Sequence, residues 1–148
     1  MLVILIIGFI LLLDQSTKFL AQQALSLGQS LPLIKGFLHL SLVHNTGAAF
    51  GIFKNQTILF VLISLFAVIF LALFYRKISG ANVLLKIACA LVLAGALGNL
   101  IDRLRFGYVI DFVDFRIWPV FNVADSCITI GTCIFAYILI SQKSKGKR

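Results

Sequence analysis

Four long apolar stretches constrain this chain more than any other feature of its sequence. They are Leu2–Leu20, Thr57–Tyr75, Val83–Leu100 and Val120–Ser141. A helix of about 20 mostly apolar residues is long enough to cross a lipid bilayer. Charged residues make up only 12% of the chain, whereas they form about a quarter of a typical soluble domain. We therefore expect an all-α integral membrane protein with four transmembrane helices, in which residues 1–148 form a single domain.

All five acidic residues are aspartates, and each lies within or beside an apolar stretch. They are Asp14, Asp102, Asp111, Asp114 and Asp125. A carboxylate at membrane depth costs a few kcal/mol on insertion scales, so the default interpretation of such a group is functional. The pattern is typical of a membrane enzyme or of a proton-coupled carrier.

The basic residues indicate how the helices are oriented. A net charge of +8 is compatible with nucleic-acid binding, but the cations cluster beside the apolar stretches instead. Those at one end of the predicted bundle are Arg76, Lys77, Lys86, Lys143, Lys145, Lys147 and Arg148. Flanking lysine and arginine mark the cytoplasmic side of a membrane helix. We expect both termini in the cytoplasm and the connections Ala21–Gln56 and Arg103–Pro119 outside, with all the aspartates on the outer side.

The first apolar stretch is expected to be a retained helix rather than a cleaved secretory signal. It has no positively charged start, and no convincing small-residue cleavage site follows it. The three cysteines, Cys89, Cys127 and Cys133, all fall inside apolar stretches, where they act as small apolar residues. The sequence contains no disulfide framework and no metal-ligand spacing, so we expect no metal or other cofactor.

Two of the predicted helices carry a stripe of small and polar residues. In the third helix, an arc of about 100° holds Gly95, Gly98, Asn99 and Asp102. In the fourth, an arc of about 120° holds Asn122, Asp125, Ser126, Thr129, Thr132, Cys133 and Ala136. Such stripes let membrane helices approach one another closely. Both are predicted to face the bundle interior, with aspartates at its outer mouth.

Asp125 is the strongest candidate for chemistry, because helix packing needs no carboxylate. Two close carboxylates cannot both ionise easily, so one keeps a proton and the pair offers a general base and a general acid at one pH. An aspartic protease uses such a pair to activate water and to protonate the leaving amine. The residues alone leave Asp102, Asp111 and Asp114 open as the partner of Asp125.

Other polar and aromatic residues lie where they can support such a pair. Asn99 and Asn122 each precede an aspartate by three residues, so they can hold a carboxylate or a substrate carbonyl. Arg103 can neutralise charge or polarise the scissile carbonyl. The aromatic residues Tyr108, Phe115 and Trp118 are predicted to anchor the outer segment at the membrane interface.

Five short motifs occur in order along almost the whole chain. They are Asp14-Gln-Ser-Thr-Lys18, Asn45-Thr-Gly-Ala-Ala-Phe50, Gly95-Ala-Leu-Gly-Asn-Leu-Ile-Asp-Arg103, Val109-Ile-Asp-Phe112 and Phe121-Asn-Val-Ala-Asp-Ser126. Together they resemble the bacterial lipoprotein signal peptidases, the signal peptidase II family. The resemblance implies an aspartic endopeptidase of the bacterial cytoplasmic membrane that removes signal peptides from prolipoproteins by cutting before a diacylglyceryl-modified cysteine.

The resemblance also implies roles for particular residues. The catalytic aspartates of the family match Asp111 and Asp125. Its polar support residues match Asn45, Asn99, Arg103 and Asn122. Asp14 and Lys18 match a pair that serves structure more than chemistry. From the residues themselves, Asp102 is expected to be structural too, because Arg103 follows it and an ion pair can hold it ionised.

The family fold and partners follow from the same resemblance. The fold adds a small extracytoplasmic β-sheet, which Ala21–Gln56 would supply with Phe37–Val43 as a strand, and a short outer helix before the fourth span. The implied partners are a diacylglyceryl-modified prolipoprotein as substrate, membrane lipids, and globomycin, a cyclic lipopeptide, as an inhibitor.

Two functions from other classes compete with this interpretation. A small proton-coupled transporter could use Asp14 and Asp125 as a relay, but a carrier needs access from both sides, and the aspartates cluster at one. A metal-dependent lipid phosphotransferase would hold Mg²⁺ with closely spaced carboxylates. Asp111 and Asp114 are the only such pair, and they are predicted to lie outside.

Overall fold

The structure is a computed structural model that describes residues 1–47, 56–77 and 82–145. Within them, four helices are long and apolar enough to cross a membrane: α1 (Leu2–Ala24), α2 (Thr57–Lys77), α3 (Val83–Phe106) and α4 (Val123–Lys145). The predicted four-helix membrane architecture is confirmed, and the chain is a multi-pass membrane protein. The described residues do not include positions 48–50, the second half of the Asn45–Phe50 motif. They also do not include the cations Lys54, Lys147 and Arg148.

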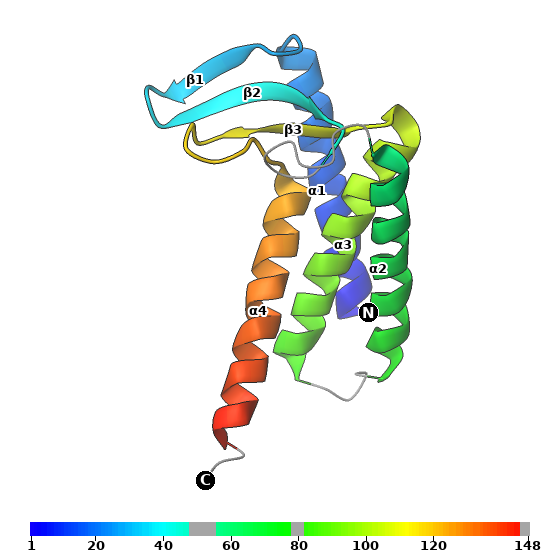
Figure 1. The fold of residues 1–148 in the computed structure, drawn as a ribbon. Coiled ribbons are helices and arrows are strands. Elements are labelled where there is room, and N and C mark those ends of the chain that lie inside the picture. Colours follow the sequence, from blue (N-terminus) through cyan, green and yellow to red (C-terminus); the bar gives the residue numbers. More distant parts are fainter. Residues whose placement is uncertain (48–55, 78–81, 146–148) are drawn as a thin grey trace.

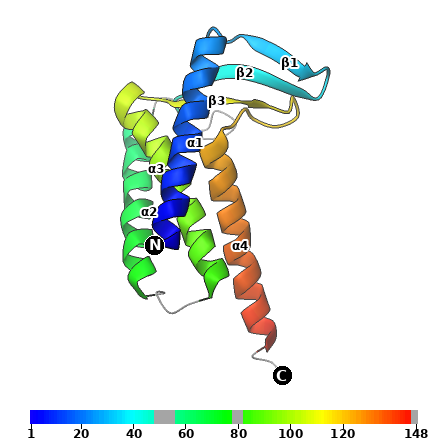
Figure 2. The same ribbon diagram turned by 180° about the vertical axis from the view of Figure 1, so that it is seen from behind.

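Helix α3 is the centre of the bundle and packs against each of the other three helices (Figures 1 and 2). Small residues make this possible. A Cβ on Gly95 would collide with the carbonyl oxygen of Ala124 in α4, and a Cβ on Gly98 would lie 2.6 Å from the Asp14 carboxylate in α1. Asn99 and Asp102, on the same face, are buried. The predicted inward stripe of the third helix is therefore confirmed.

Helix α3 is capped at both ends, and its C-terminal cap turns the chain back towards the bundle. At the start, the Asn82 side-chain oxygen accepts a hydrogen bond from the Leu84 N–H at 3.0 Å, which caps the helix. At the end, Gly107 takes the left-handed conformation with φ 82°, and its N–H donates to the Arg103 carbonyl. The next strand begins only two residues later, at Val109.

A three-stranded antiparallel sheet projects sideways from one end of the bundle (Figure 1). Its order is β1 (Ser30–Ile34), β2 (Leu38–Asn45) and β3 (Val109–Asp114). The predicted strand Phe37–Val43 corresponds to β2. An apolar cluster fixes the sheet to the bundle; it consists of Ala21, Leu25, Leu42, Ile110 and Phe112. This cluster positions β3, and with it Asp111, at the mouth of the helices.

The short outer helix expected before the fourth span is not present in residues 107–122, all of which the structure describes. A strand, β3, takes its place and pairs with β2. The chain then doubles back, so that Phe121 pairs with Val113. The segment Val109–Asp114 is rich in β-branched and aromatic residues, which favour a pleated, buried strand. Pairing with a strand distant in sequence decides the conformation here.

The predicted inward stripe of the fourth helix is only partly right. Asn122 is buried and Asp125 is half-buried, but Thr129, Thr132 and Cys133 are exposed. The two threonine hydroxyls donate to carbonyls one turn earlier, at 2.9 and 2.7 Å. Because this local bond satisfies the hydroxyl, a threonine needs no place in the bundle interior. The residues of α4 that meet α3 closely are smaller and include Ala124 and Gly131.

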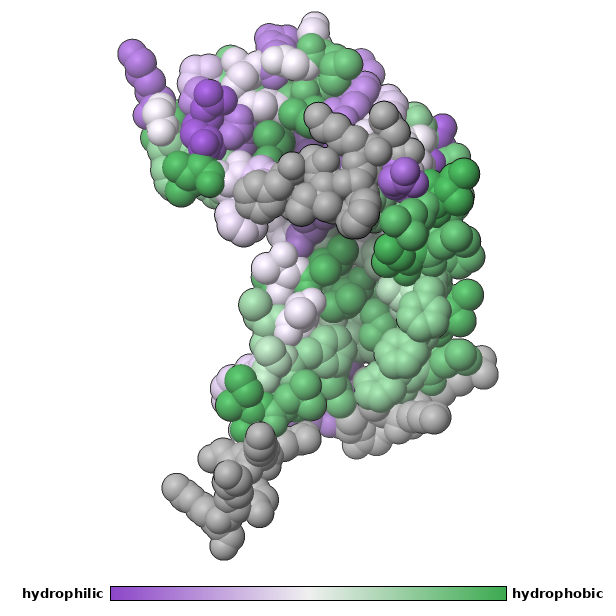
Figure 3. Space-filling view, viewed as in Figure 1, coloured by the Kyte–Doolittle hydropathy of each residue, from purple (hydrophilic) through white to green (hydrophobic). Residues whose placement is uncertain are grey.

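The surface divides along the length of the molecule. In the face shown in Figure 3, hydrophobic residues cover the helices and hydrophilic residues gather over the sheet. Helix α2 is the extreme case, since no residue of its apolar segment Thr57–Phe74 is buried. An apolar surface of this kind suits the hydrocarbon core of a bilayer. The sheet then marks the end of the bundle that meets the aqueous interface.

Candidate active site

Strand β3 brings Asp111 into the mouth of the bundle. The residue is opposite Val43 of β2, and only 1% of its surface is exposed. Its two carboxylate oxygens each accept a hydrogen bond from an asparagine. The donors are Asn45 Nδ2, at 2.9 Å, and Asn122 Nδ2, at 2.7 Å. Neutral amides, rather than a cation, therefore hold this buried carboxylate.

Asp125 lies in the first turn of α4, where it takes part in the helix cap. The Asn122 side-chain oxygen accepts from the Asp125 N–H at 2.9 Å, and the Asn122 N–H points to Asp125 Oδ2 at 3.4 Å. This reciprocal arrangement is a capping box. The other oxygen, Asp125 Oδ1, accepts from Asn99 Nδ2 at 2.7 Å. The cap thus fixes Asp125 with one edge towards α3.

Asn122 joins the two aspartates. It has no exposed surface, and its Nδ2 contacts Asp111 Oδ1, Asn99 Oδ1 at 3.1 Å and the Ile110 carbonyl at 3.3 Å. The same side chain caps the helix that carries Asp125. One asparagine therefore holds β3, α3 and α4 together at the point where both carboxylates lie.

Asp111 is coupled electrostatically to Asp125. Burial raises the pKa of Asp111 to about 7, and the nearby charge of Asp125 acts in the same direction. The hydrogen bonds from Asn45 and Asn122 oppose this shift without cancelling it. Two neighbouring carboxylates that share one proton are the expected result near neutral pH. A pair of this kind can supply an acid and a base together.

A second carboxylate cluster lies deeper, between α1 and α3. The Lys18 ammonium is 2.8 Å from Asp14 Oδ2 and 2.8 Å from Asp102 Oδ2. Gln15 Nε2 bridges the two carboxylates, at 3.2 Å from Asp14 and 3.0 Å from Asp102. The ion pair expected for Asp102 is therefore present, and its partner is Lys18. We call Asp14, Lys18 and Asp102 the ion-pair triad.

The ion-pair triad also ties separate elements together through backbone hydrogen bonds. Asp14 Oδ1 accepts from the Ala124 N–H at 2.9 Å, in the first turn of α4. Asp102 Oδ2 accepts from the Ile110 N–H at 3.1 Å, in β3. These bonds place the residues next to Asp125 and Asp111 relative to α1 and α3. A structural part for this cluster follows from the geometry.

Asp114 lies apart from both groups. Its Oδ2 accepts from Ser41 Oγ at 2.7 Å and pairs with Arg116 at 3.1 Å. Burial alone would raise the pKa of Asp114, but the hydrogen bonds from Ser41 and Arg116 outweigh burial and lower it. Three partners were left open for Asp125. Among the hydrogen bonds of the described residues, only Asp111 shares a hydrogen-bonding residue, Asn122, with it.

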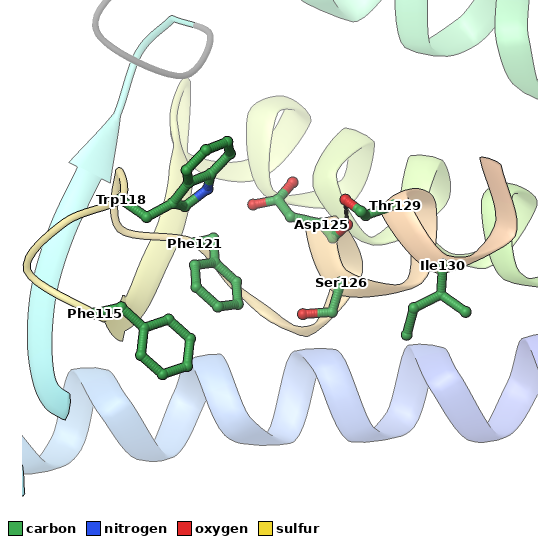
Figure 4. Close-up of a pocket in the computed structure, with 7 residues that line it drawn as sticks. All are labelled: Phe115, Trp118, Phe121, Asp125, Ser126, Thr129 and Ile130. Carbon is green, nitrogen blue, oxygen red and sulfur yellow. Dashed lines mark hydrogen bonds between the residues drawn. The ribbon is translucent and has the colours of Figure 1, made fainter. Parts of the chain in front are cut away.

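Two pockets meet at Asp125. A polar one, of about 250 Å³, includes Asn45, Asn99 and Arg103 in its lining. Arg103 stacks over the Phe60 ring, 5.1 Å from its centroid. An apolar pocket of about 340 Å³ is lined by Phe115, Trp118, Phe121, Asp125, Ser126, Thr129 and Ile130. Figure 4 shows the three aromatic rings gathered on one side of it and the four α4 residues beside them.

The structure brings together the site residues expected from sequence and adds others. Asn45, Asn99, Arg103 and Asp125 line the polar pocket. Asp111 and Asn122 lie behind them, hydrogen-bonded to Asn45 and Asn99 respectively. Gln15 was missed, although it sits in the Asp14–Lys18 motif; its position beside Asp14 was the available signal. Phe121, Phe115 and Trp118 form a pocket wall, which an aromatic count alone does not reveal. Among the described residues, no three His, Cys, Asp or Glu side chains cluster as metal ligands would.

Comparison with known proteins decides the class of enzyme. Residues 6–141 match the family described as Signal peptidase (SPase) II. The chain belongs to the signal peptidase II family. A lipoprotein signal peptidase of Halothermothrix orenii is 43% identical to it over 144 residues, which are 97% of this chain and 99% of that relative. Another, from Caldanaerobacter subterraneus, is 48% identical over 139 residues, 93% of this chain and 94% of the relative.

Solved structures agree with this family assignment. A bacterial membrane enzyme determined by the in meso method at 2.3 Å resolution superposes with a TM-score of 0.91. It is 37% identical, and the match covers 97% of this chain and 90% of that one. The signal peptidase II member described here is therefore a membrane-embedded protease with the architecture of bacterial membrane enzymes. Nothing in these comparisons favours the transporter alternative.

Proposed function

We propose that this peptidase is an aspartic endopeptidase that cuts the signal peptide from prolipoproteins, using Asp111 and Asp125 as its catalytic pair. The observation that carries the proposal is the state of Asp111. It is buried beside Asp125, linked to it through Asn122, and its pKa is raised to about 7. A carboxyl group that keeps its proton near neutral pH, next to a second carboxylate, is the arrangement that activates water and protonates an amine.

The reaction needs no group beyond the two aspartates and one water. The ionised aspartate takes a proton from water while the water oxygen bonds to the scissile carbonyl carbon. The protonated aspartate then gives its proton to the leaving nitrogen as the carbon–nitrogen bond breaks. Arg103 lines the same pocket and can polarise the carbonyl oxygen as negative charge develops there. Asn45, Asn99 and Asn122 hold the carboxylates in place.

The two pockets suggest how a lipid-modified substrate lies at the site. The polar pocket suits a peptide backbone, because its asparagines and arginine offer hydrogen-bond donors. The apolar pocket suits the hydrocarbon of a diacylglyceryl group, since burying apolar chain contributes about 0.8 kcal/mol per CH₂. Both include Asp125 in their lining. The scissile bond, just before the lipid-bearing cysteine, would then fall between them.

The orientation of the protein in the bacterial cytoplasmic membrane is part of the proposal. The start of α1 and the end of α4 lie at the end of the bundle away from the sheet (Figures 1 and 2). The last residues of α2 and α4 include the cations Arg76, Lys77, Lys143 and Lys145, which therefore lie at this end, as cations do in cytoplasmic segments. The sheet and both aspartates of the pair would then lie at the outer face, where exported precursors carry their cleavage site.

One assay tests the activity and the substrate class together. Purified protein in detergent is incubated with a diacylglyceryl-modified prolipoprotein, with the unmodified precursor in a parallel reaction. We expect cleavage of the modified precursor only, inhibition by globomycin, and no effect of a metal chelator. Equal cleavage of the unmodified precursor would show that the lipid is not recognised, and loss of cleavage with chelator would exclude a mechanism that uses aspartates alone.

A further inference from the structure

Lys18 is a buried cation whose hydrogen-bonding capacity is fully used. Only 2% of its surface is exposed. Its ammonium group has three N–H donors and no acceptor. Three acceptors surround it: Asp14 Oδ2 and Asp102 Oδ2, both at 2.8 Å, and Asn99 Oδ1 at 3.1 Å. The first two form the ion-pair triad, whereas the third is a residue of the active site.

This third contact fixes which way the Asn99 amide points. The oxygen and nitrogen of an asparagine side chain are often interchangeable, because either can face a hydroxyl or water. An ammonium group cannot accept a hydrogen bond, so only the oxygen of Asn99 can face Lys18. Asn122 Nδ2 donates to the same oxygen at 3.1 Å and enforces the same orientation. The NH₂ group of Asn99 must then point away, towards Asp125 Oδ1 at 2.7 Å.

The consequence is a difference between the two aspartates of the pair. An amide whose oxygen is bound to a cation is polarised, so its N–H groups donate more strongly. Asp125 receives such a donor, and a strong donor favours the ionised form of a carboxyl group. Asp111 receives amide donors from Asn45 and Asn122. Within the described residues, the oxygens of these two amides accept from the backbone N–H groups of Gly47 and Asp125 and not from an ammonium group.

We propose that Lys18 is a positioning residue of the peptidase, which holds the Asn99 amide with its NH₂ towards Asp125 and thereby makes Asp125 the proton acceptor and Asp111 the proton donor. The inference rests on the proposed aspartic mechanism and assigns its two roles. Asp125 takes the proton from the attacking water, and Asp111 gives its proton to the leaving nitrogen. The ion-pair triad is thus connected to the chemistry as well as to the fold.

Other charged groups around Asp125 also influence its ionisation, so a test that varies pH must account for them. Asp14 and Lys18 face it from α1, Arg103 from α3, and Asp111 from β3. Arg103 carries a positive charge close to both aspartates, so it does not distinguish between them in sign. Lys18 differs because it reaches Asp125 through a single intervening side chain. The test must therefore change Lys18 while Arg103 and Asp111 stay in place.

The test compares two variants that both lack the Asp14 carboxylate. Asp14→Asn keeps Lys18 and keeps an oxygen for the Ala124 N–H. Lys18→Met combined with Asp14→Asn removes one positive and one negative charge, so the net charge of the triad stays at −1, as in the unchanged protein. Cleavage of the modified precursor is measured against pH for both, as kcat and KM, with the folded fraction of each.

We expect the double variant to fold and to lose kcat by about 10- to 100-fold relative to Asp14→Asn, the range for removing a partner that orients a reacting group. The acidic limb of its kcat profile should move to higher pH by about one unit. KM should change little. Lys18→Arg, which keeps a cation and its donors, should leave the limb in place. Identical kcat profiles for the double variant and Asp14→Asn would overturn the proposal.

A measurement on the unchanged protein covers the case in which the double variant does not fold. The side-chain NH₂ signal of Asn99 is followed by NMR in protein labelled with ¹⁵N-asparagine, and is assigned by its loss in Asn99→Ser. It should shift along the acidic limb of activity and stay constant as Asp111 titrates near pH 7. A signal that instead follows Asp111 would overturn the proposal. Retained cleavage by Asp125→Asn would refute the aspartic mechanism itself, which is a separate failure.

Discussion

The ion-pair triad and the Asp111–Asp125 pair are both buried carboxylate clusters, but they are held in opposite ways. In the triad, Lys18 lies 2.8 Å from each carboxylate, and Gln15 and two backbone N–H groups bind the remaining lone pairs. In the pair, only neutral side-chain and backbone amides make hydrogen bonds to the carboxylates, as far as the described residues show. Both carboxylates of the triad have a cation within hydrogen-bond distance, and those of the pair do not among the described residues.

This difference separates stability from chemistry. A buried carboxylate that contacts a cation is stabilised as part of the fold, and breaking such a contact is costly. A buried carboxylate beside another carboxylate resists ionisation, as the raised pKa of Asp111 shows. The protein therefore places carboxylates that contact a cation where they join α1, α3 and α4, and leaves a pair held by neutral amides where a proton must move. Asn99 touches both clusters.

The largest expected effect is the loss of cleavage when either aspartate of the pair loses its carboxylate. Asp111→Asn and Asp125→Asn keep the shape of the side chain and should each lower kcat by about 10³-fold or more, since general acid and general base catalysis both fail. The double variant should be scarcely worse, because the pair acts as a unit. Cleavage of the modified precursor in detergent measures this.

Asp114→Asn is the matched control for these two variants. Asp114 is also an aspartate of β3, but it bonds to Ser41 and Arg116 and does not contact the pair. It should keep substantial activity. Near-normal turnover in Asp111→Asn together with lost turnover in Asp102→Asn would mean that the partner of Asp125 belongs to the triad, so the triad would not be purely structural.

Removing the cation of the ion-pair triad should lower the stability of the fold. Lys18→Met leaves two buried carboxylates without their cation, and breaking a buried ion pair in this way costs about 3–5 kcal/mol. Thermal unfolding in detergent should show a strongly destabilised protein. Lys35→Met is the control, because Lys35 is exposed in the turn between β1 and β2, and it should unfold at the temperature of the unchanged protein. Equal unfolding temperatures for the two variants would show that the triad does not stabilise the fold.

A smaller loss of stability is expected when the close contact between Asp14 of α1 and Gly98 of α3 is disturbed. In Gly98→Ala, the new Cβ would lie 2.6 Å from an oxygen of Asp14 that Lys18 and Gln15 hold in place. Overpacking of this kind costs about 1–3 kcal/mol. Gly8→Ala, in α1, meets nothing within 4 Å and should be neutral or slightly stabilising. The same unfolding assay compares them, and a neutral Gly98→Ala would show that Asp14 can move.

The parts of this fold that sequence predicts well are those that depend on local composition. The four spans follow from hydropathy, because a helix in a bilayer satisfies its backbone hydrogen bonds within one segment. The inward face of α3 follows from Gly95 and Gly98, since only small residues permit the contacts seen there. Strand β2 follows from its own apolar residues.

The parts that sequence predicts poorly depend on partners distant in the chain. Asp111 and Asp114 are three residues apart, which suits a helix, yet pairing with β2 makes their segment a strand. The spacing of Thr129 and Thr132 predicts that they face the bundle interior. In the structure their hydroxyls bond to carbonyls of their own helix, and both residues are exposed. The residues alone also left Asp102 open as a partner of Asp125, because nothing local shows that Lys18, in α1, binds it.

The pH dependence of kcat tests the shared proton of the Asp111–Asp125 pair most directly. The pKa of Asp111 is raised to about 7, chiefly by burial and further by Asp125, so its protonated form persists up to that pH. With Asp111 as the proton donor, cleavage of the modified precursor should be sustained below pH 7 and fall about tenfold per unit above it. Asp114→Asn should give the same curve. A kcat that stays constant from pH 6 to 9, in protein shown to be folded throughout, would contradict the account.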